Sequence, residues 1–283
     1  MHQIQLLKKY GLSVRGARSQ HLLVDENIQR KLVSAVNPKA GETILEIGPG
    51  LGAITELLLK SGARVVAVEQ DRRFVEILKG ELETDFDHLK LVHGDILKIS
   101  LDRFVSRGSH LKVVGNIPYY ITSPILLYLI KHRRVVDSAY LMMQREIADR
   151  IFAQPGTKAY GRLSLLVRYY ADVRRAFEIS RHCFSPEPKV DSSFIELVFR
   201  RKLPESIDED ALFTLIKFGF ATRRKRLLNA LTDGFRGKVD KQKLKDILNE
   251  AGFSENVRAE ELMLKDFMRL AVALRGQAFD LAE

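Results

Sequence analysis

Four short apolar runs in the first half of the chain each end in small or polar residues. They read TILEIGPG, RVVAVEQD, LKLVHGD and KVVGNIPY. Between the first two lies AITELLLKSG, helical in period and stopped by Gly62, and between the next two lies DRRFVEILKGELE, opened by Asp71. Continuous Val, Ile and Leu runs that alternate with amphipathic helices are typical of parallel strands covered on both faces. The pattern therefore predicts a doubly wound α/β sheet.

The same pattern divides the rest of the chain. A helix is expected after an N-cap at Asp25, further strands at SAYLMMQ, RRAFEIS and SSFIELVFR, and helices around Arg145–Phe152 and Arg162–Tyr170. After Pro204 the apolar spacing is helical throughout, including DEDALFTLIKFGFATRRKRLLNAL as one stretch. We therefore expect three parts: an N-terminal arm (1–24), an α/β domain (25–204) and a small all-α domain (205–283).

Charge points to a polyanionic partner. Lys and Arg outnumber Asp and Glu by 46 to 36, for a net charge of +10, which favours nucleic acid first and a membrane surface second. The longest apolar run, SPILLYLI, is far shorter than the roughly 20 residues that span a bilayer, and the N-terminus lacks a signal-peptide core. Cys183 is the one cysteine, so we expect neither a disulfide nor a cysteine-rich metal site, and a reducing, cytoplasmic setting.

The N-terminal arm carries no acidic residue before Asp25 but contains Lys8, Lys9, Arg15 and Arg18. This composition fits either a solvated tail or an arm that contacts nucleic acid.

The residues that follow the strands predict the position of a site, because ligands of open α/β sheets bind outside the carboxyl ends of the strands. Those residues are Gly48 to Gly52, Glu69, Asp95 and Asn116. Glycines allow close approach of a ligand to the backbone, and Glu69 has the spacing of an acid that binds a ribose hydroxyl pair. Asp95 would lie over the base. Gly48, Gly50 and Ala53 also satisfy the dinucleotide pattern G-x-G-x-x-A, so a nicotinamide enzyme and a purely structural turn both stay open.

The fourth strand end, Asn116-Ile117-Pro118-Tyr119, favours methyl transfer to an exocyclic amine. The lone pair of an adenine amine is delocalised into its ring, so a site must hold the nitrogen toward tetrahedral geometry. The Asn116 side-chain oxygen and the Ile117 carbonyl would accept its two N–H bonds, while Pro118 fixes the turn. Tyr119 would stack on the base and stabilise developing positive charge. The alternative is a capped turn followed by core tyrosines, and Tyr120 in particular could pack inward.

With EIGPGLGAIT, VEQD, GDIL and NIPYYITSP in this order, the chain resembles the S-adenosylmethionine-dependent ribosomal RNA adenine dimethyltransferases. QREIADRI, GTKAYGRLS, CFSPEPKVDSSF and FATRRKRLLNAL extend the resemblance over nearly the whole chain. It implies a Rossmann-like class I methyltransferase sheet, with an N-terminal arm that closes over the cofactor and a helical domain near RNA. The implied contacts to S-adenosylmethionine come from His21, Leu23, Gly48, Gly50, Glu69, Gln70, Asp95, Ile96 and Asn116.

Three details of the resemblance concern single positions. The motif that is usually Gln-Asn-Phe-Leu reads Gln20-His21-Leu22-Leu23 here, and on its own His21 would be an ordinary surface histidine. Phe184 matches the aromatic that the family places against the target base, where the residue pattern alone favours a core phenylalanine. Arg223, Arg224 and Arg226 match a segment near RNA, where a basic run on a helix is otherwise a solvated face. Such contacts position RNA without reading its sequence.

The resulting hypothesis is dimethylation of the N6 amines of two adjacent adenosines in the 3′-terminal hairpin of small-subunit ribosomal RNA. The partner would be an assembling, pre-ribosomal small subunit, and the enzyme a cytoplasmic monomer. One alternative is a large-subunit adenine methyltransferase of the antibiotic-resistance type. Another is an RNA-binding assembly or transcription factor that has the fold without turnover.

Overall fold

The structure is a computed structural model, which describes residues 3–12, 21–83, 86–106, 108–204 and 207–275. The chain divides into two compact units. Unit 1 comprises Met1–Ala148 and Asp172–Arg201, and unit 2 comprises Asp149–Ala171 and Lys202–Glu283. The sequence placed the start of the helical domain near residue 205 and assigned all of 25–204 to the α/β domain. That expectation is incomplete, because a segment from the middle of the chain belongs to the helical unit as well.

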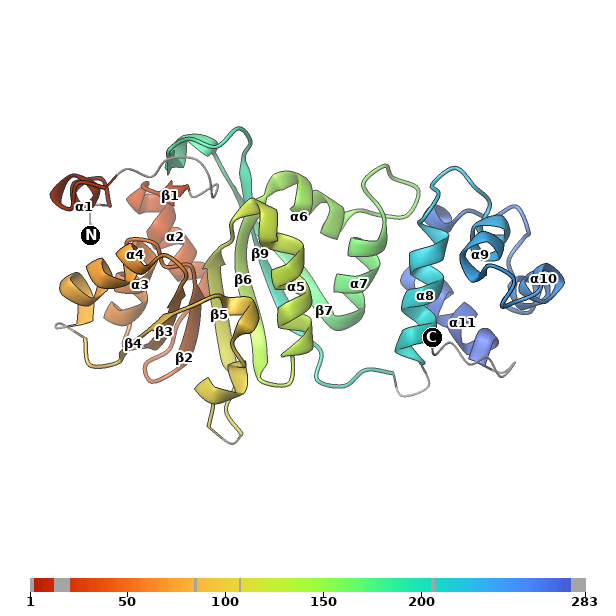
Figure 1. The fold of residues 1–283 in the computed structure, drawn as a ribbon, viewed down its shortest axis with the longest axis horizontal. Helices are drawn as coiled ribbons and strands as arrows, with labels where there is room; N and C mark the ends of the chain where they lie inside the picture. Colours follow the sequence, from red (N-terminus) through yellow and green to blue (C-terminus); the bar gives the residue numbers. More distant parts are fainter. Residues whose placement is uncertain (1–2, 13–20, 84–85, 107, 205–206, 276–283) are drawn as a thin grey trace. The chain divides into compact units, whose positions relative to one another are not determined.

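A seven-stranded sheet forms the centre of unit 1, in the order β4-β3-β2-β5-β6-β9-β7 (Figure 1). Its strands are β2 (Thr43–Ile47), β3 (Arg64–Glu69), β4 (Leu89–His93), β5 (Leu111–Asn116), β6 (Val136–Gln144), β7 (Ala171–Ile179) and β9 (Ser192–Phe199). Strands β2 to β6 run parallel, and β9 pairs antiparallel with β6. The predicted doubly wound α/β sheet is confirmed. Its parallel pairing brings four strand ends to one edge.

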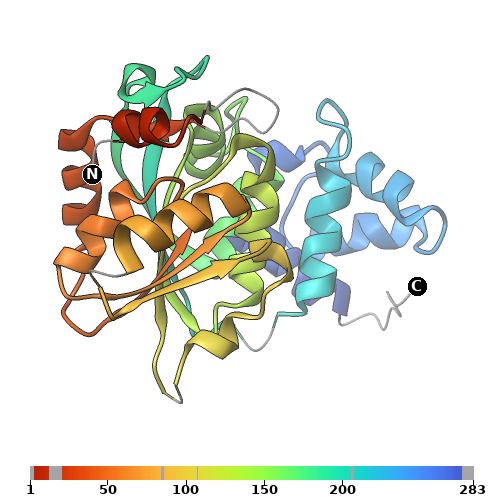
Figure 2. The same ribbon diagram turned by 60° about the vertical axis from the view of Figure 1, so that its left-hand side comes forward.

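The apolar runs are continuous because both faces of the sheet are covered. Ile44, Val65 and Val114 belong to one core cluster, and the residues that alternate with them, such as Leu45 and Val113, are also fully buried. Since successive side chains of a strand point to opposite faces, burial at every position requires packing on both sides. Helices α3 and α4 pack against β3 and β4 (Figure 2).

Four helices of unit 1, which begin at Glu26, Ala53, Arg72 and Arg145, begin where the sequence predicted, whereas the first and the fifth helix were not predicted. The helices of unit 1 are α1 (Gln3–Lys9), α2 (Glu26–Val36), α3 (Ala53–Lys60), α4 (Arg72–Leu78) and α5 (Thr122–Lys131), followed by α6 (Arg145–Phe152), which runs into unit 2. Asp25 caps α2 by accepting from the Ile28 N–H, and Asp71 caps α4 by accepting from the Arg73 N–H. Each cap satisfies a backbone donor that has no partner within its helix.

The described part of the N-terminal arm packs onto unit 1. Strand β1 (Leu22–Leu23) pairs antiparallel with β8 (Phe184–Ser185), and the buried Gln3 side chain donates to the Leu23 carbonyl. Lys9 and Tyr10 both bond to Glu81. These contacts place β1 against the sheet at the edge where the strand ends meet. Arg15 and Arg18 lie outside the described residues.

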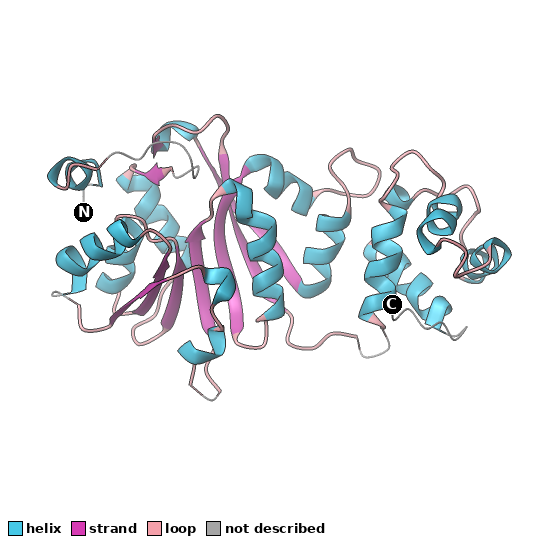
Figure 3. Ribbon diagram, in the orientation of Figure 1, coloured by secondary structure: helices cyan, strands magenta, loops and turns pink. Residues whose placement is uncertain are grey.

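Unit 2 is helical, and the described residues after Lys202 form helices and turns only (Figure 3). Its further helices are α7 (Arg162–Tyr170), α8 (Glu209–Gly219), α9 (Leu227–Phe235), α10 (Lys241–Glu250) and α11 (Leu264–Arg275). Helix α7 packs on α8 and α11, which explains why its segment joins this unit. In the described residues no helix is both long and apolar enough to cross a membrane.

Candidate active site

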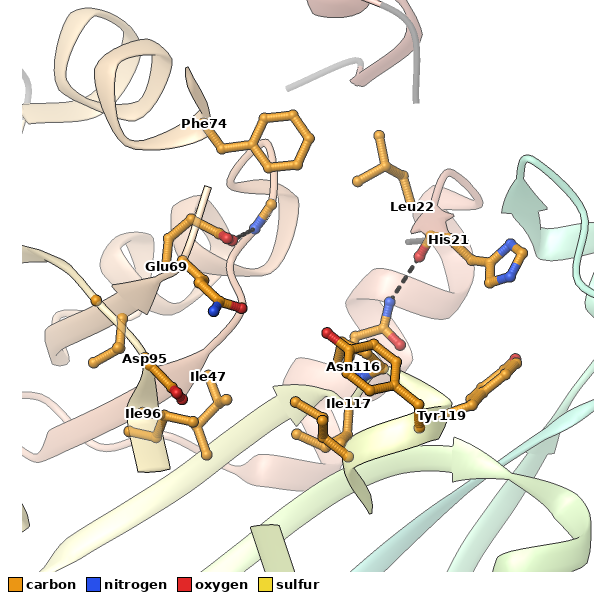
Figure 4. A pocket seen from close by; sticks show the side chains of 18 residues that line it. His21, Leu22, Ile47, Glu69, Phe74, Asp95, Ile96, Asn116, Ile117 and Tyr119 are labelled. Atoms are coloured by element: carbon orange, nitrogen blue, oxygen red, sulfur yellow. Dashed lines mark hydrogen bonds between the residues drawn. The ribbon is translucent and has the colours of Figure 1, made fainter. Parts of the chain in front are cut away.

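The strand ends of unit 1 surround one cavity (Figure 4). Its lining comprises His21, Leu22, Ile47, Gly48, Gly50, Val68, Glu69, Gln70, Phe74, Gly94, Asp95, Ile96, Asn116, Ile117, Pro118, Tyr119, Tyr120 and Ile121. The structure thus brings together all four strand ends that the sequence singled out.

The glycine turn after β2 forms one wall. Gly48 and Gly50 have φ values of 69° and 58°, in the left-handed region that other residues rarely adopt. A Cβ on Gly50 would lie 3.1 Å from Leu22 Cδ2, so a larger residue would crowd the arm. The turn is fastened to the next strand, because the Gly50 N–H donates to Glu69 Oε2 over 3.1 Å.

Glu69 is a buried carboxylate at the cavity wall, with 5% of its surface exposed. Its second oxygen, Oε1, accepts from the Asp71 N–H over 2.8 Å. Burial raises the pKa of Glu69, while the backbone N–H groups of Asp71 and Gly50 oppose that rise. The carboxylate is thus held rigidly by two backbone donors, as an acceptor for hydroxyl groups must be.

Asp95, Ile96 and Gln70 complete this side of the cavity. Asp95 Oδ1 accepts from the Leu97 N–H over 3.0 Å, which fixes the carboxylate at the start of a short 3₁₀ turn. Ile96 is buried and supplies an apolar surface next to it. Phe74, which the sequence interpretation missed, lies opposite on α4. The sequence feature that could have identified Phe74 is its position in the first turn of the helix that follows Glu69.

Asn116 ends β5, and its carboxamide has a defined orientation. Nδ2 donates to the His21 carbonyl over 2.9 Å (Figure 4). Oδ1 has no donor among the described residues and is left to accept from a ligand. The partner residue lies 95 positions away in the chain, so this bond joins the N-terminal arm to the strand end.

The next residues form the turn that the sequence predicted. The Ile117 N–H donates to the Met142 carbonyl over 3.0 Å, and Pro118 leads into a short 3₁₀ turn. The Tyr119 hydroxyl bonds to Ser192 Oγ at 3.1 Å, and its ring stacks on His21 with 5.7 Å between centroids. Tyr120 does not pack inward, since 57% of its surface is exposed.

In the N-terminal motif, the leucine side chain that lines the cavity belongs to Leu22 and not, as the resemblance had implied, to Leu23. Leu22 lines the cavity, whereas the Leu23 side chain is buried in the sheet core with 4% exposed. Pairing of β1 with β8 decides which of the two neighbours faces the site. His21 lies at the cavity with Nδ1 bonded to the Pro186 carbonyl at 2.6 Å. It is not an isolated surface histidine.

Phe184 does not project into the cavity, contrary to expectation. Its ring belongs to the core cluster, with 5% exposed, because β8 pairs with β1 and turns this side chain inward beside Leu23. Phe184 therefore occupies the core position that the residue pattern alone favoured, and it does not line the cavity. Contact with a target base stays a prediction.

The basic run lies in unit 2, where a second correction applies. Residues 221–226 form turns between α8 and α9 rather than part of one long helix. Arg223 is engaged within the unit: it pairs with Glu260 at 3.1 Å and donates to the carbonyls of Thr157 and Lys158. Arg224 and Arg226 are exposed.

Glu46, on β2, is a second buried acid that the sequence interpretation missed. It lies next to a smaller cavity that shares Leu22, Gly50 and Asn116 with the first. Its Oε2 has no hydrogen-bond partner in the described part of the chain. Burial raises the pKa of Glu46 to about 7, and the charge of Glu69 adds to the rise while the Thr55 hydroxyl opposes it.

These features fit a nucleoside-bearing sulfonium cofactor. The glycine turn leaves room for close approach, Glu69 and Asp95 offer acceptors for ribose hydroxyls and a purine amine, and Phe74 and Ile96 offer apolar surface. An Asn-Ile-Pro-Tyr turn stands beside them, so the fold and cavity define an S-adenosylmethionine-dependent methyltransferase that acts on an amine.

The family follows from comparison with known proteins. The family model described as "Ribosomal RNA adenine dimethylase" matches residues 12–272, and the chain belongs to that family. The resemblance inferred from the motifs is thus confirmed, and so is S-adenosylmethionine as the methyl donor.

Individual relatives agree. A "Ribosomal RNA small subunit methyltransferase A" of Streptococcus pneumoniae strain P1031 is 43% identical over 280 residues, which cover 96% of each chain. The crystal structure of a dimethyladenosine transferase from Plasmodium falciparum superposes with a TM-score of 0.76 at 28% identity, covering 91% of this chain and 98% of that one. The 23S rRNA methyltransferase ErmE has the same fold, with a TM-score of 0.67 at 22% identity over 90% of this chain and 99% of that one.

Proposed function

We propose that this enzyme dimethylates the N6 amines of two adjacent adenosines in the 3′-terminal hairpin of small-subunit ribosomal RNA. The RNA would be met in a pre-ribosomal small subunit, by a cytoplasmic monomer. The name of the Streptococcus relative supports the choice of subunit. The orientation of the Asn116 carboxamide is the single observation that carries the chemistry.

The Asn116 carboxamide has a fixed orientation because one N–H of its Nδ2 is bonded to the N-terminal arm. With Nδ2 bonded to the His21 carbonyl, Oδ1 accepts one N–H of the target amine. The Ile117 carbonyl accepts the other N–H of the amine. The backbone N–H of Ile117 donates to the Met142 carbonyl on the neighbouring strand, which holds this turn in place. Two acceptors at fixed positions draw the amine out of the ring plane, so its lone pair becomes available for attack.

Tyr119 supplies the platform for the adenine ring. Its hydroxyl is anchored on Ser192 and its ring lies against His21, so the side chain is held before the base arrives. An enzyme that acts on a base takes the base out of its stack and holds it between flat groups. The aromatic face also stabilises the cationic nitrogen formed during transfer by about 1 to 2 kcal/mol.

The cofactor supplies an electrophilic methyl group when it is bound, with Glu69, Asp95 and the glycine turn holding its nucleoside part. No general base is required before attack, because the neutral amine is the nucleophile and its extra proton passes to water afterwards. The second methyl addition uses the same acceptors, with a single N–H left to bond. We propose that the arm closes over the cofactor through His21 and Leu22.

Substitution of Asn116 by Ala tests the clamp. Loss of one acceptor in a preorganised site is expected to lower kcat by about 10² to 10³-fold, with binding of S-adenosylhomocysteine, measured by calorimetry, largely kept. Asn27→Ala, an exposed asparagine on α2, is the matched control. Methyl transfer that survived in N116A at the wild-type rate would refute the assignment.

Labelled cofactor distinguishes the functions. Purified precursor small and large subunits are each incubated with the enzyme and S-adenosylmethionine labelled in its methyl group, and the RNA is digested for mass spectrometry. We expect dimethyladenosine at two adjacent positions in the small-subunit RNA. Label in the large subunit alone would identify a large-subunit enzyme, and no label in either would favour a non-catalytic factor.

A further inference from the structure

The basic turn between α8 and α9 divides its charges between two tasks. Arg223 and Lys225 are used within unit 2: Arg223 bonds to Glu260 and to two carbonyls, and Lys225 pairs with Asp233 at 2.6 Å. The side chains of Arg224 and Arg226 are exposed and make no hydrogen bond or ion pair with any described residue. The free cations of this turn therefore alternate with structural ones.

Beside this turn lies a hollow that is confined to unit 2. Its lining comprises Arg162, Lys217, Phe218, Ala221, Thr222, Ala230, Asp233, Gly234 and Arg236. The three cations come from the start of α7, the end of α8 and the C-cap of α9. The one carboxylate of the lining, Asp233, is already neutralised by Lys225.

The three cations are left without a counter-charge. Arg162, Lys217 and Arg236 are exposed and have no ion pair among the residues that the structure describes. Several surface arginines outside the hollow are paired, such as Arg200 with Asp172 and Arg201 with Asp137. Like charges gathered around one hollow repel each other and attract a small anion, an effect that solvent weakens but does not remove.

The residue that ends α9 has a left-handed backbone conformation although it is not a glycine. Arg236 has a φ of 47° at the end of α9, where glycine is the usual residue, and Gly237 follows it at 80°. A cation near a helix C-terminus gains modestly from the helix dipole. Arg236 also lines the hollow together with Arg162 and Lys217.

We propose that this hollow of unit 2 binds one phosphodiester group of the ribosomal RNA substrate through Arg162, Lys217 and Arg236. Arg224 and Arg226 extend the contact along the backbone, while Arg223 serves the fold. The inference rests on the proposed function for its ligand, since RNA is the polyanion that this family modifies. Contacts of this kind position the RNA and do not read its sequence.

The test compares two double variants of the full-length protein that lose equal charge. K217Q/R236N removes two cations of the hollow, with Asn chosen because it tolerates the left-handed conformation of Arg236. K238Q/K241Q removes two exposed cations that do not line it. RNA affinity is measured as a function of salt concentration. The RNA is a fragment that the wild-type enzyme methylates, taken from whichever ribosomal subunit is its substrate. The test of the hollow therefore does not depend on whether the small subunit is the correct substrate.

We expect the hollow variant to flatten the plot of log affinity against log salt by about 0.7 to 0.9, the slope of one phosphate contact, and to raise KM for RNA about tenfold. The control should leave both near wild type. Ethylation interference gives the sharper readout: one phosphate whose ethylation weakens wild type should cease to matter in the hollow variant. An interference pattern identical to wild type, or equal losses in both variants, would overturn the proposal.

Discussion

The buried carboxyl of Glu46 makes the stability of unit 1 depend on pH in an unusual direction. Its side chain is buried, and the pKa rises from 4.5 to about 7. The folded state therefore holds this proton more tightly than the unfolded state. The contribution to the free energy of unfolding is complete below pH 4.5 and is lost as the pH rises through about 7.

Substitution of Glu46 by Gln keeps the shape and removes the titration. A shift of this size corresponds to roughly 3 kcal/mol, since one pKa unit is worth about 1.4 kcal/mol. Part of this stabilisation has already been lost at pH 5. Through Glu46, the free energy of unfolding should therefore fall by about 2 to 3 kcal/mol between pH 5 and pH 8.5. The variant should be nearly as stable as wild type at pH 5 and more stable at pH 8.5.

Urea unfolding followed by circular dichroism at both pH values measures the difference, and hydrogen exchange of the β2 amides assigns it to unit 1. Groups that titrate independently of Glu46 are common to both proteins and cancel in the difference. E76Q, which removes a carboxyl group from the surface, serves as the control, since the Glu76 side chain is 57% exposed. Parallel curves for wild type and E46Q would show that Glu46 does not hold its proton in the folded protein.

Two further predictions concern the glycine turn and the cofactor. Gly52→Ala should cost about 2 to 4 kcal/mol of stability, because its φ is 81° and the new Cβ would lie 2.6 Å from Leu78 Cδ2. Gly41 has a φ of 75° and open space around it, so Gly41→Ala measures the cost of backbone strain alone. Equal decreases in melting temperature in the two variants would show that the contact with Leu78 adds nothing to the cost at Gly52. Glu69→Gln should weaken S-adenosylhomocysteine binding about 10- to 100-fold in calorimetry, the loss of a charged hydrogen-bond acceptor; an unchanged Kd would remove Glu69 from the cofactor site.

The sequence by itself determined the sheet and the edge at which the site lies. Strand runs, helix periods and the caps Asp25 and Asp71 depend on neighbours a few residues away, and such signals survive in a one-dimensional pattern. Parallel strands then bring Gly48, Glu69, Asp95 and Asn116 to one edge without further information.

Only the tertiary structure decided what each of several side chains does. The Asn116 amide is oriented by a carbonyl 95 residues away, and pairing of β1 with β8 sends Leu22 to the cavity and Leu23 to the core. Arg223 is engaged by Glu260, 37 residues further on. Contacts between distant segments set a side chain's direction, burial and partners, and no local period encodes them.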